Sequence, residues 1–241
     1  MKSIELENLT WIEAEETINN YQIALIALGA RTKEHGPHLQ LNNDYLLAEF
    51  LKEQVKAQVP TIVLPTLQYG YYPAFIEYPG SVTLTKETFC NMVVEICQSI
   101  SSYGIRKFYI LNTGVSTLLP LEQAAKILSK EGVTLKYFDI LGFSKELPDN
   151  LLLQEGGSHA DEEETSIMLH IAPETVDMSK AVKDLDLRPN RKGLTRDPNG
   201  DSTFSPTGIW GDPTLATREK GRIIVDIMVS TIIKQINEMI E

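Results

Sequence analysis

Two of the four histidines in this 241-residue chain lie in a short segment that also carries a glutamate and an aspartate. The segment runs from Glu34 and His35 through His38 to Asp44, and it follows directly after a predicted strand. Imidazole and carboxylate groups together suit zinc, manganese or iron better than calcium. Ligands of α/β proteins bind at the carboxyl ends of the strands. We therefore predict a divalent-metal site here, with zinc as the expected ion and manganese or iron as alternatives.

The same residues also have an ordinary structural interpretation. Glu34 and His35 could be turn residues, and Asp44 could be the N-cap of the next helix. The spacing alone does not decide between the two interpretations. A third histidine, His159, precedes a run of four acidic residues that ends at Glu164, at a second predicted junction between a loop and a helix. An acidic first turn alone is more often a solvated face, but the nearby histidine favours the metal site.

Short apolar runs and segments with helical spacing alternate along the first two thirds of the chain. The apolar runs, rich in Val, Ile, Leu and Tyr, predict buried strands. They are Gln22–Leu28, Thr61–Leu64, Lys107–Leu111 and Thr134–Ile140. Helices are expected between them at Asp44–Ala57, Lys86–Ser101 and Leu121–Lys130. This alternation predicts a parallel sheet with helices on both faces.

Two further helices and one long loop are expected after these elements. Asp161 is placed to cap a helix that ends at His170, with its acidic first turn at the positive end of the helix dipole. The last helix is expected to begin near Asp212-Pro213 and to continue to the C-terminus. The segment Arg188–Pro206 is polar and rich in Pro and Gly, which predicts a long surface loop inside the domain.

Composition limits the kind of protein this can be. The hydrophobic share of 42% is enough for a core of one large α/β domain or two small ones. A formal charge of −11 argues against a nucleic-acid partner, which needs clustered Lys and Arg. No stretch has the length of a signal peptide or a membrane span, so we expect a cytoplasmic protein without a membrane partner. Cys90 and Cys97 are expected to be reduced.

Four motifs, in order along the chain, carry a family resemblance. They are Gly36-Pro37-His38-Leu39 with Asp44, the pair Tyr69-Gly70-Tyr71 and Tyr78-Pro79-Gly80-Ser81, His159-Ala160 before Glu164-Thr165-Ser166, and the run from Trp210-Gly211-Asp212-Pro213 to Gly221. Together they resemble the creatininase (creatinine amidohydrolase) family from about residue 10 to residue 225.

The resemblance implies a fold, an assembly and a reaction. The fold is a three-layer αβα sandwich with a mainly parallel sheet, formed by one domain over residues 1–241 and often assembled as a hexamer. The reaction is hydrolysis of a carbon–nitrogen bond in a small amide at a one- or two-metal site. Carried over by residue, Glu34, His35, Asp44 and Glu164 are expected metal ligands, with Asp44 as a bridge between two ions. His159 is the expected catalytic residue that supplies or relays a proton.

The chain departs from the family pattern in its first ligand cluster. The family usually separates its ligand Glu and His by one residue, whereas Glu34 and His35 are adjacent. If the extra residue is ignored, Lys33 falls on the ligand position, where a protonated amine cannot coordinate. His38 could then substitute as a ligand, and the sequence leaves that choice open.

A larger departure follows the strand predicted at Lys107–Leu111. The family usually has Asn-Gly-His there, with a metal-binding histidine, but this chain has Asn112-Thr113-Gly114-Val115-Ser116-Thr117. Ser116 also stands where creatininases have a glutamate ligand. Such a turn offers N–H groups and hydroxyls that could hold a substrate carboxylate or phosphate. We therefore expect Ser116 and Thr117 to bind substrate, together with His38 and Tyr71.

Two groups of aromatic residues are open to more than one interpretation. The tyrosines from Tyr69 to Tyr78, with Phe75, could wall a small pocket or be ordinary core residues. Trp210 could be a wall of the same pocket or a packing residue under the last helix, and packing is the favoured interpretation. The predicted function is a metal-dependent amidohydrolase that acts on a small-molecule amide other than creatinine. The alternative is an inactive family member that binds a small metabolite without metal.

Overall fold

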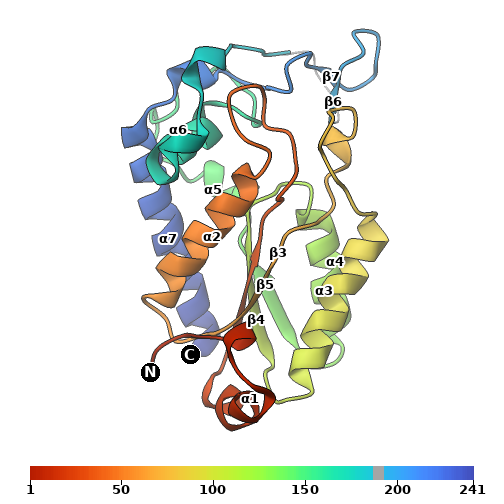
Figure 1. Ribbon diagram of the computed structural model, residues 1–241, viewed down its shortest axis with the longest axis vertical. Coiled ribbons are helices and arrows are strands. Elements are labelled where there is room, and N and C mark those ends of the chain that lie inside the picture. The colour runs from red at the N-terminus through yellow and green to blue at the C-terminus, as the bar shows by residue number, and fades with distance from the viewer. Residues whose placement is uncertain (187–192) are drawn as a thin grey trace.

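A five-stranded parallel sheet lies between two layers of helices in the computed structural model, which describes residues 1–186 and 193–241 (Figure 1). The spatial order of the strands is β1-β3-β2-β4-β5. Every neighbouring pair in this sheet is parallel. The strands are β1 (Ile4–Glu5), β2 (Ala24–Leu28), β3 (Ile62–Leu67), β4 (Lys107–Asn112) and β5 (Thr134–Tyr137).

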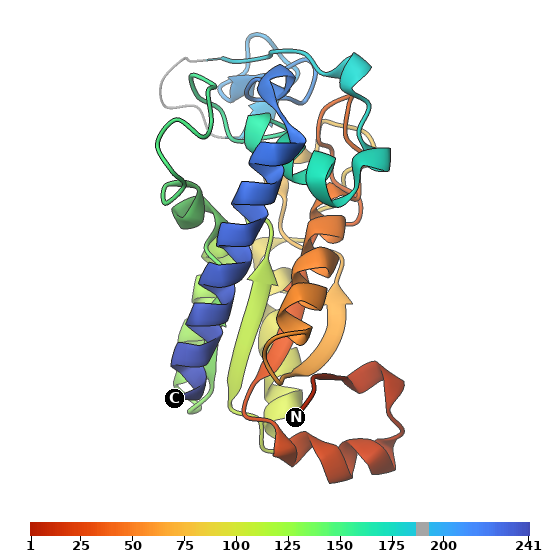
Figure 2. The same cartoon turned by 90° about the vertical axis from the view of Figure 1, so that its left-hand side faces the viewer.

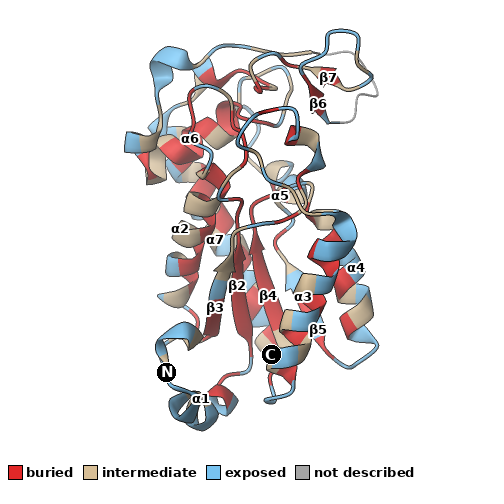
Figure 3. Cartoon of the chain, turned by 45° about the vertical axis from the view of Figure 1, so that its right-hand side comes forward, coloured by how far each residue is buried: buried red, intermediate tan, exposed pale blue. Residues whose placement is uncertain are grey.

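Helices cover both faces of the sheet because alternate residues of each strand point to opposite faces. Ile26 and Ile110 belong to the apolar cluster that includes α3 (Lys86–Ser101) and α4 (Leu118–Ser129). Their neighbours in the strands pack against α2 (Asn43–Lys56) and α7 (Arg218–Ile240) on the other face. The central strands β2 and β4 are buried almost throughout (Figure 3). The predicted three-layer sandwich is confirmed.

The order of the strands fixes where a ligand site can form. The strand β2 lies between β3 and β4, and the helices that follow β2 and β4 cover opposite faces of the sheet. The loops that leave the carboxyl ends of β2 and β4 therefore diverge and open a crevice between them. Such a crevice is the usual binding place in open α/β sheets.

Most predicted elements are present, although several of their ends differ from the prediction by two or more residues. Two of the differences have an identifiable cause. The strand expected to reach Ile140 ends at Tyr137, because Asp139 caps the short helix α5 (Ile140–Ser144) by accepting from the Gly142 N–H at 2.9 Å. The last helix begins at Arg218 and not near residue 212. Asp212 instead caps a short 3-10 turn, and Thr217 caps α7.

The helix α6 (Glu162–Ile171) confirms another prediction, since Asp161 is its N-cap and accepts from the Glu164 N–H at 3.0 Å. The helix α1 (Trp11–Thr17), which is not among the predicted elements, lies at the end of the molecule opposite α6 (Figure 2). The helix α1 is stabilised by a capping box between Thr10 and Glu13. Cys90 and Cys97 are buried on α3 and form no disulfide.

The segment predicted as the surface loop Arg188–Pro206 has two parts. Its residues 188–192 lie outside the described residues. The rest contains β6 (Leu194–Thr195) and β7 (Thr203–Phe204), which pair in parallel, and Leu194, Thr195 and Thr203 are buried. The prediction of a surface loop agrees with the exposed residues 196–199 between the two strands. It is wrong for β6 and β7, because the Thr195 hydroxyl donates to the carboxylate of Glu77 and fixes β6 to the rest of the fold. In the described part of the chain, no helix is long and apolar enough to cross a membrane.

Candidate metal centre

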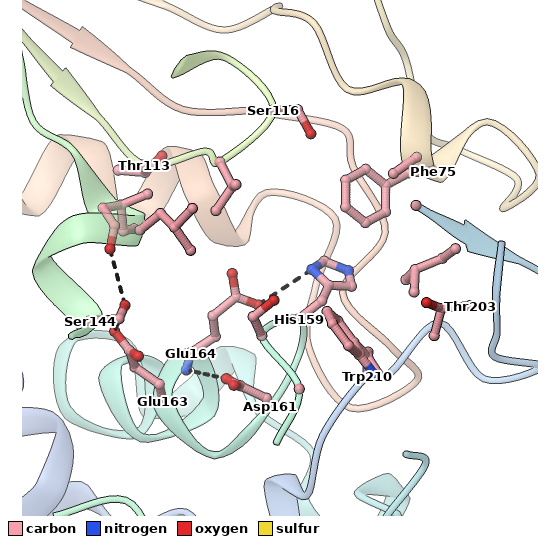
Figure 4. A pocket seen from close by; sticks show the side chains of 18 of the residues that line it. Phe75, Thr113, Ser116, Ser144, His159, Asp161, Glu163, Glu164, Thr203 and Trp210 are labelled. Atoms are coloured by element: carbon pink, nitrogen blue, oxygen red, sulfur yellow. Dashed lines mark hydrogen bonds and ion pairs between the residues drawn. The ribbon is translucent and has the colours of Figure 1, made fainter. Parts of the chain in front are cut away.

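A cavity of about 440 Å³ opens at the carboxyl end of the sheet (Figure 4). One part of its wall is aromatic, formed by Tyr72, Phe75 and Trp210. Aliphatic residues, glycines and a set of polar side chains line the remainder. The polar side chains are those of Lys33, Thr113, Ser116, Ser144, Lys145, Gln154, Ser158, His159, Asp161, Glu163, Glu164 and Thr203. The volume suits a small molecule.

His35 is fully buried beside this cavity, and both of its ring nitrogens face hydrogen-bond acceptors. Its Nδ1 is 3.0 Å from the backbone oxygen of Lys33, and its Nε2 is 2.7 Å from Oδ1 of Asp44. The backbone oxygen can only accept, so Nδ1 carries a proton. A neutral ring then has no proton left for Nε2, which must either be protonated as well or face a cation. Metal-binding histidines typically donate their other N–H to a carbonyl or carboxylate in this way.

His159 shows the same arrangement with its nitrogens exchanged. Its Nε2 is 2.7 Å from Oε1 of Glu34 and 3.1 Å from the Glu34 backbone oxygen, both of which are acceptors. The proton of a neutral His159 ring therefore lies on Nε2. Its Nδ1 points toward Oε2 of Glu164 at 3.6 Å, as Figure 4 shows. This distance is too long for a hydrogen bond and suits two ligands of one ion.

His159 and Glu34 shift each other's pKa, because their charged forms attract each other. Burial alone would lower the pKa of His159, but the carboxylate of Glu34 outweighs burial and raises it. Burial would likewise raise the pKa of Glu34, but the charge on His159 lowers it. The ring thus attracts a second positive charge, which a proton or a metal ion can provide.

Glu164 completes a group of three residues able to hold an ion. One ligand atom each from His35, His159 and Glu164 lies within 4.8 Å of the others. Glu164 is fixed by its Oε2, which accepts from the Ala160 N–H at 2.6 Å. Ala160 has a φ of 48°, a left-handed conformation that is rare for any residue but glycine. This sharp turn places His159 and the start of α6 on the same side of the cavity.

The donor set of His35, His159 and Glu164 fits one divalent ion. Two imidazole nitrogens and one carboxylate are the ligands that zinc, manganese or iron prefers. Three protein ligands leave at least one coordination position for a substrate or water. The residues present therefore agree with a catalytic type of metal site.

Asp44 lies next to this group and not within it. The N-cap of α2 is Asn42, so the alternative in which Asp44 caps the helix is wrong. The Asp44 side chain is buried, and its Oδ2 is 2.7 Å from Nζ of Lys33. Burial would raise the pKa of Asp44, but the Lys33 ammonium lowers it well below its usual value. Burial would lower the pKa of Lys33, and the Asp44 carboxylate outweighs this and raises it.

Not every predicted site residue reaches the cavity. Glu34 approaches His159 and the Gly36 N–H, so its carboxylate orients the ring. His38 is buried behind the cavity, with its Nε2 2.8 Å from Oγ1 of Thr165, and burial lowers its pKa to about 4. Its place agrees with a structural role.

Of the two substrate-binding residues predicted in the turn after β4, one lines the cavity and the other does not. Ser116 lines the cavity, as expected. The Thr117 hydroxyl is instead bonded within the turn, to Oδ1 of Asn112 at 2.5 Å and to the Gly114 oxygen at 2.7 Å. A Cβ added at Gly114 would lie 3.2 Å from both Thr117 and the ring of Tyr72. A metal-binding side chain at position 114 would therefore have little room.

Some cavity residues were missed or given another role from the sequence. Tyr71 packs against the apolar cluster under α3, and its neighbour Tyr72 takes the place on the cavity wall. Trp210 lines the cavity and does not pack under α7; its backbone pairs with that of His159. In an extended segment neighbouring side chains point opposite ways, and the sequence did not show which tyrosine faces inward. The one sequence feature that could have placed Lys33 at the site is its position directly before Glu34-His35.

The fold and this three-residue group define a three-layer α/β protein with a metal-capable site at the point where the sheet connections diverge. The family model described as "Creatininase: Creatinine amidohydrolase" matches residues 7–236. The chain therefore belongs to the creatininase family.

Curated relatives span nearly the same length. Creatinine amidohydrolase of Pseudomonas putida is 26% identical, with 98% of this chain and 97% of the relative covered. The 3-dehydro-scyllo-inosose hydrolase of Thermotoga maritima is 25% identical over 99% of this chain and 84% of the relative. A mycofactocin precursor peptide peptidase of Mycobacterium ulcerans is 28% identical over 88% and 83%.

Solved structures agree in fold. The structure titled "Creatininase Mn" has a TM-score of 0.84 at 23% identity, with 99% of each chain covered. A mutant creatininase described as Zn-Zn type has a TM-score of 0.81 at 24% identity, also over 99% of each chain. At this identity the likeness establishes the shared fold.

Proposed function

We propose that this protein is a metal-dependent hydrolase of a carbon–nitrogen bond in a small amide, with one divalent ion held by His35, His159 and Glu164. The observation that carries the proposal is the hydrogen bonding of the two rings. The backbone oxygen of Lys33 accepts from Nδ1 of His35, and Glu34 accepts from Nε2 of His159. The nitrogens that could bind an ion are therefore Nε2 of His35, which lies beside Oδ1 of Asp44, and Nδ1 of His159, which faces Glu164. The curated relatives are named as hydrolases, which supports the same class of reaction here.

A bound divalent ion would supply Lewis acidity toward the amide carbonyl and toward water. The chain's own residues do the rest. Glu34 holds the Nε2 proton of His159 and fixes the ring, while the Ala160 N–H fixes Glu164. Tyr72, Phe75 and Trp210 give the cavity an aromatic wall against which an apolar part of a substrate can pack.

His159 has two competing roles, and one variant separates them. The sequence predicts that His159 carries a proton, whereas its geometry beside His35 and Glu164 supports a role as a ligand. We propose the ligand role. His159→Asn should then lose bound metal and turnover together. Loss of turnover with the metal retained would instead support the proton carrier.

The substrate is proposed to be a small amide other than creatinine. The relatives' names refer to different substrates, so family membership alone does not select one. In this chain the turn after β4 presents Ser116 to the cavity where the family has metal-binding side chains. We propose that Ser116 contacts the substrate, and that Thr117 keeps the turn in shape through its internal hydrogen bonds.

A hydrolysis screen tests the proposed function. Protein stripped with a chelator is reloaded with zinc, manganese or ferrous iron and assayed on cyclic amides, lactams and formamides. Turnover is expected from the reloaded wild type and not from the stripped protein or from His35→Ala. His170→Ala is the matched control, since His170 lies on α6 outside the three-residue group. If none of the three ions binds the wild type, the proposal fails and a metal-free binding protein is favoured.

Assembly and location stay predictions of the sequence. A homo-oligomer, with a hexamer as the form implied by the family resemblance, can be checked by light scattering on the purified protein. The predicted cytoplasmic location can be checked by cell fractionation.

A further inference from the structure

Lys33 places a positive charge in the interior of the molecule, at the edge of the cavity. Lys33 is 4% exposed, and its Nζ lies 4.8 Å from the centre of the Phe75 ring. Taking an ammonium group out of water costs several kcal/mol unless a counter-ion compensates. Asp44 provides that counter-ion at 2.7 Å, and among the described residues it is the one acid within 4 Å of Nζ.

The acidic groups nearest the two rings and Lys33 set how much positive charge the site can hold. They are the carboxylates of Asp44, Glu34 and Glu164. One ammonium and one divalent ion together balance these three negative charges. A second divalent ion beside Lys33 would leave an excess of positive charge in a buried place, which low polarity makes costly.

The side of the cavity beyond Asp44 also lacks further ligands. The Asn112 side chain and the Thr117 hydroxyl are hydrogen-bonded within the turn after β4. Gly114 has no side chain, and Ser116 offers only a hydroxyl. In the described part of the chain, the one group of three metal-ligating residues is His35, His159 and Glu164. A solved relative is described as Zn-Zn type. The difference expected between that protein and this chain is the number of bound ions.

We propose that the Lys33 ammonium is a permanent cation of this site, occupying the place beside Asp44 that a second metal ion would need, so that the protein binds one divalent ion per chain. This inference rests on the proposed function, because it assumes that an ion binds to the three-residue group. It assigns Lys33 as a positioning residue that holds the Asp44 carboxylate beside the three-residue group. It also explains how a buried lysine fits among residues typical of a metal site.

Calorimetric titration of the chelator-stripped full chain with zinc or manganese, followed by elemental analysis, tests the inference. The wild type should bind one ion per chain at saturation. Lys33→Met removes the permanent cation, so metal should bind roughly tenfold more tightly or in a second equivalent. Lys52→Met is the matched control: Lys52 is a buried lysine on α2 that pairs with Glu49, and this variant should behave as the wild type.

The outcomes separate this inference from the proposed function. Two ions in the wild type, or metal binding by Lys33→Met that is no stronger than in the wild type, would overturn the permanent cation and leave the hydrolase proposal standing. No ion in the wild type would overturn both. If Lys33→Met fails to fold, the double variant with Asp44→Asn removes both charges. It should bind one ion, and the wild-type stoichiometry decides independently of any variant.

Discussion

Two carboxylates each lie beside one ring of the histidine pair, Asp44 beside His35 and Glu164 beside His159, and they differ in their cationic partners. Asp44 is 2% exposed at its side chain and is bonded to the Lys33 ammonium. The Glu164 side chain is 22% exposed and faces Nδ1 of His159 at 3.6 Å. Among the described residues no lysine or arginine lies within 4 Å of the Glu164 carboxylate. The Asp44 carboxylate is thus neutralised by a lysine of the chain itself, whereas the Glu164 carboxylate is free to bind an added ion.

The Lys33–Asp44 pair and the Glu164 carboxylate should therefore have different roles. The Lys33–Asp44 side should matter most for the stability of the fold, because both charges are buried and depend on each other. The Glu164 side should matter most for metal affinity and little for stability. Variants of these residues can therefore test whether stability depends mainly on Asp44 and metal affinity mainly on Glu164.

The largest effect is expected for Asp44→Asn. The substitution leaves the Lys33 ammonium buried without a counter-ion, which should lower the free energy of unfolding by about 3–5 kcal/mol. Urea denaturation measures the loss. Asp226→Asn is the control, because Asp226 pairs with Arg222 on the exposed face of α7 and should cost well under about 1 kcal/mol. Equal costs for the two variants would contradict a buried, interdependent ion pair.

The next effect is expected on the other side, for Glu164→Gln. The amide is a poor metal ligand, so the affinity for zinc or manganese should fall roughly 100-fold or more, which exceeds the usual effect of residues that only support ligands. Competition with a chromogenic chelator measures it. The exposed Glu155→Gln serves as the comparison. Unchanged affinity would remove Glu164 from the metal site.

A smaller effect is expected for Glu34→Gln. The substitution removes the carboxylate that fixes His159, and supporting groups of this kind contribute about 10–100-fold to metal affinity. The same competition assay applies. A loss as large as that of Glu164→Gln would indicate that Glu34 is itself a ligand, as the sequence predicts.

The smallest effect concerns His38 and depends on pH. Burial lowers the pKa of His38 to about 4, from 6.5 in the unfolded chain. Between these values the unfolded state binds more protons, so the stabilising contribution is present above pH 6.5 and is lost as the pH falls. Relative to His38→Gln, metal-free wild type should lose about 1.6 kcal/mol between pH 6.5 and 5. Parallel curves for the two proteins would contradict the shifted pKa.

The layers of the fold could be predicted from sequence because their signals are local. The apolar runs at β2 and β4 and the helical spacing of α3 need no knowledge of distant residues. Boundaries failed where a capping residue served a different element, as Asp212 and Asp139 did. The edge strand β1 has two residues, which is too short to give a pattern.

The site could be predicted in part for the same reason. His35 and Asp44 lie nine residues apart, and one segment brings them together. The contact between Glu34 and His159 joins positions 125 residues apart, and only the folded chain shows it. The pairing of Lys33 with Asp44 was missed because an isolated lysine is ordinarily exposed. Its burial depends on the aromatic wall that packs over it.

Anomalous X-ray diffraction at the zinc absorption edge, from crystals grown with excess zinc, tests the central claim most directly. One strong anomalous peak is expected among His35, His159 and Glu164, and none between Asp44 and the cavity. Two peaks at the site would contradict the permanent cation at Lys33. The absence of any peak, with zinc in excess, would contradict the metal centre itself.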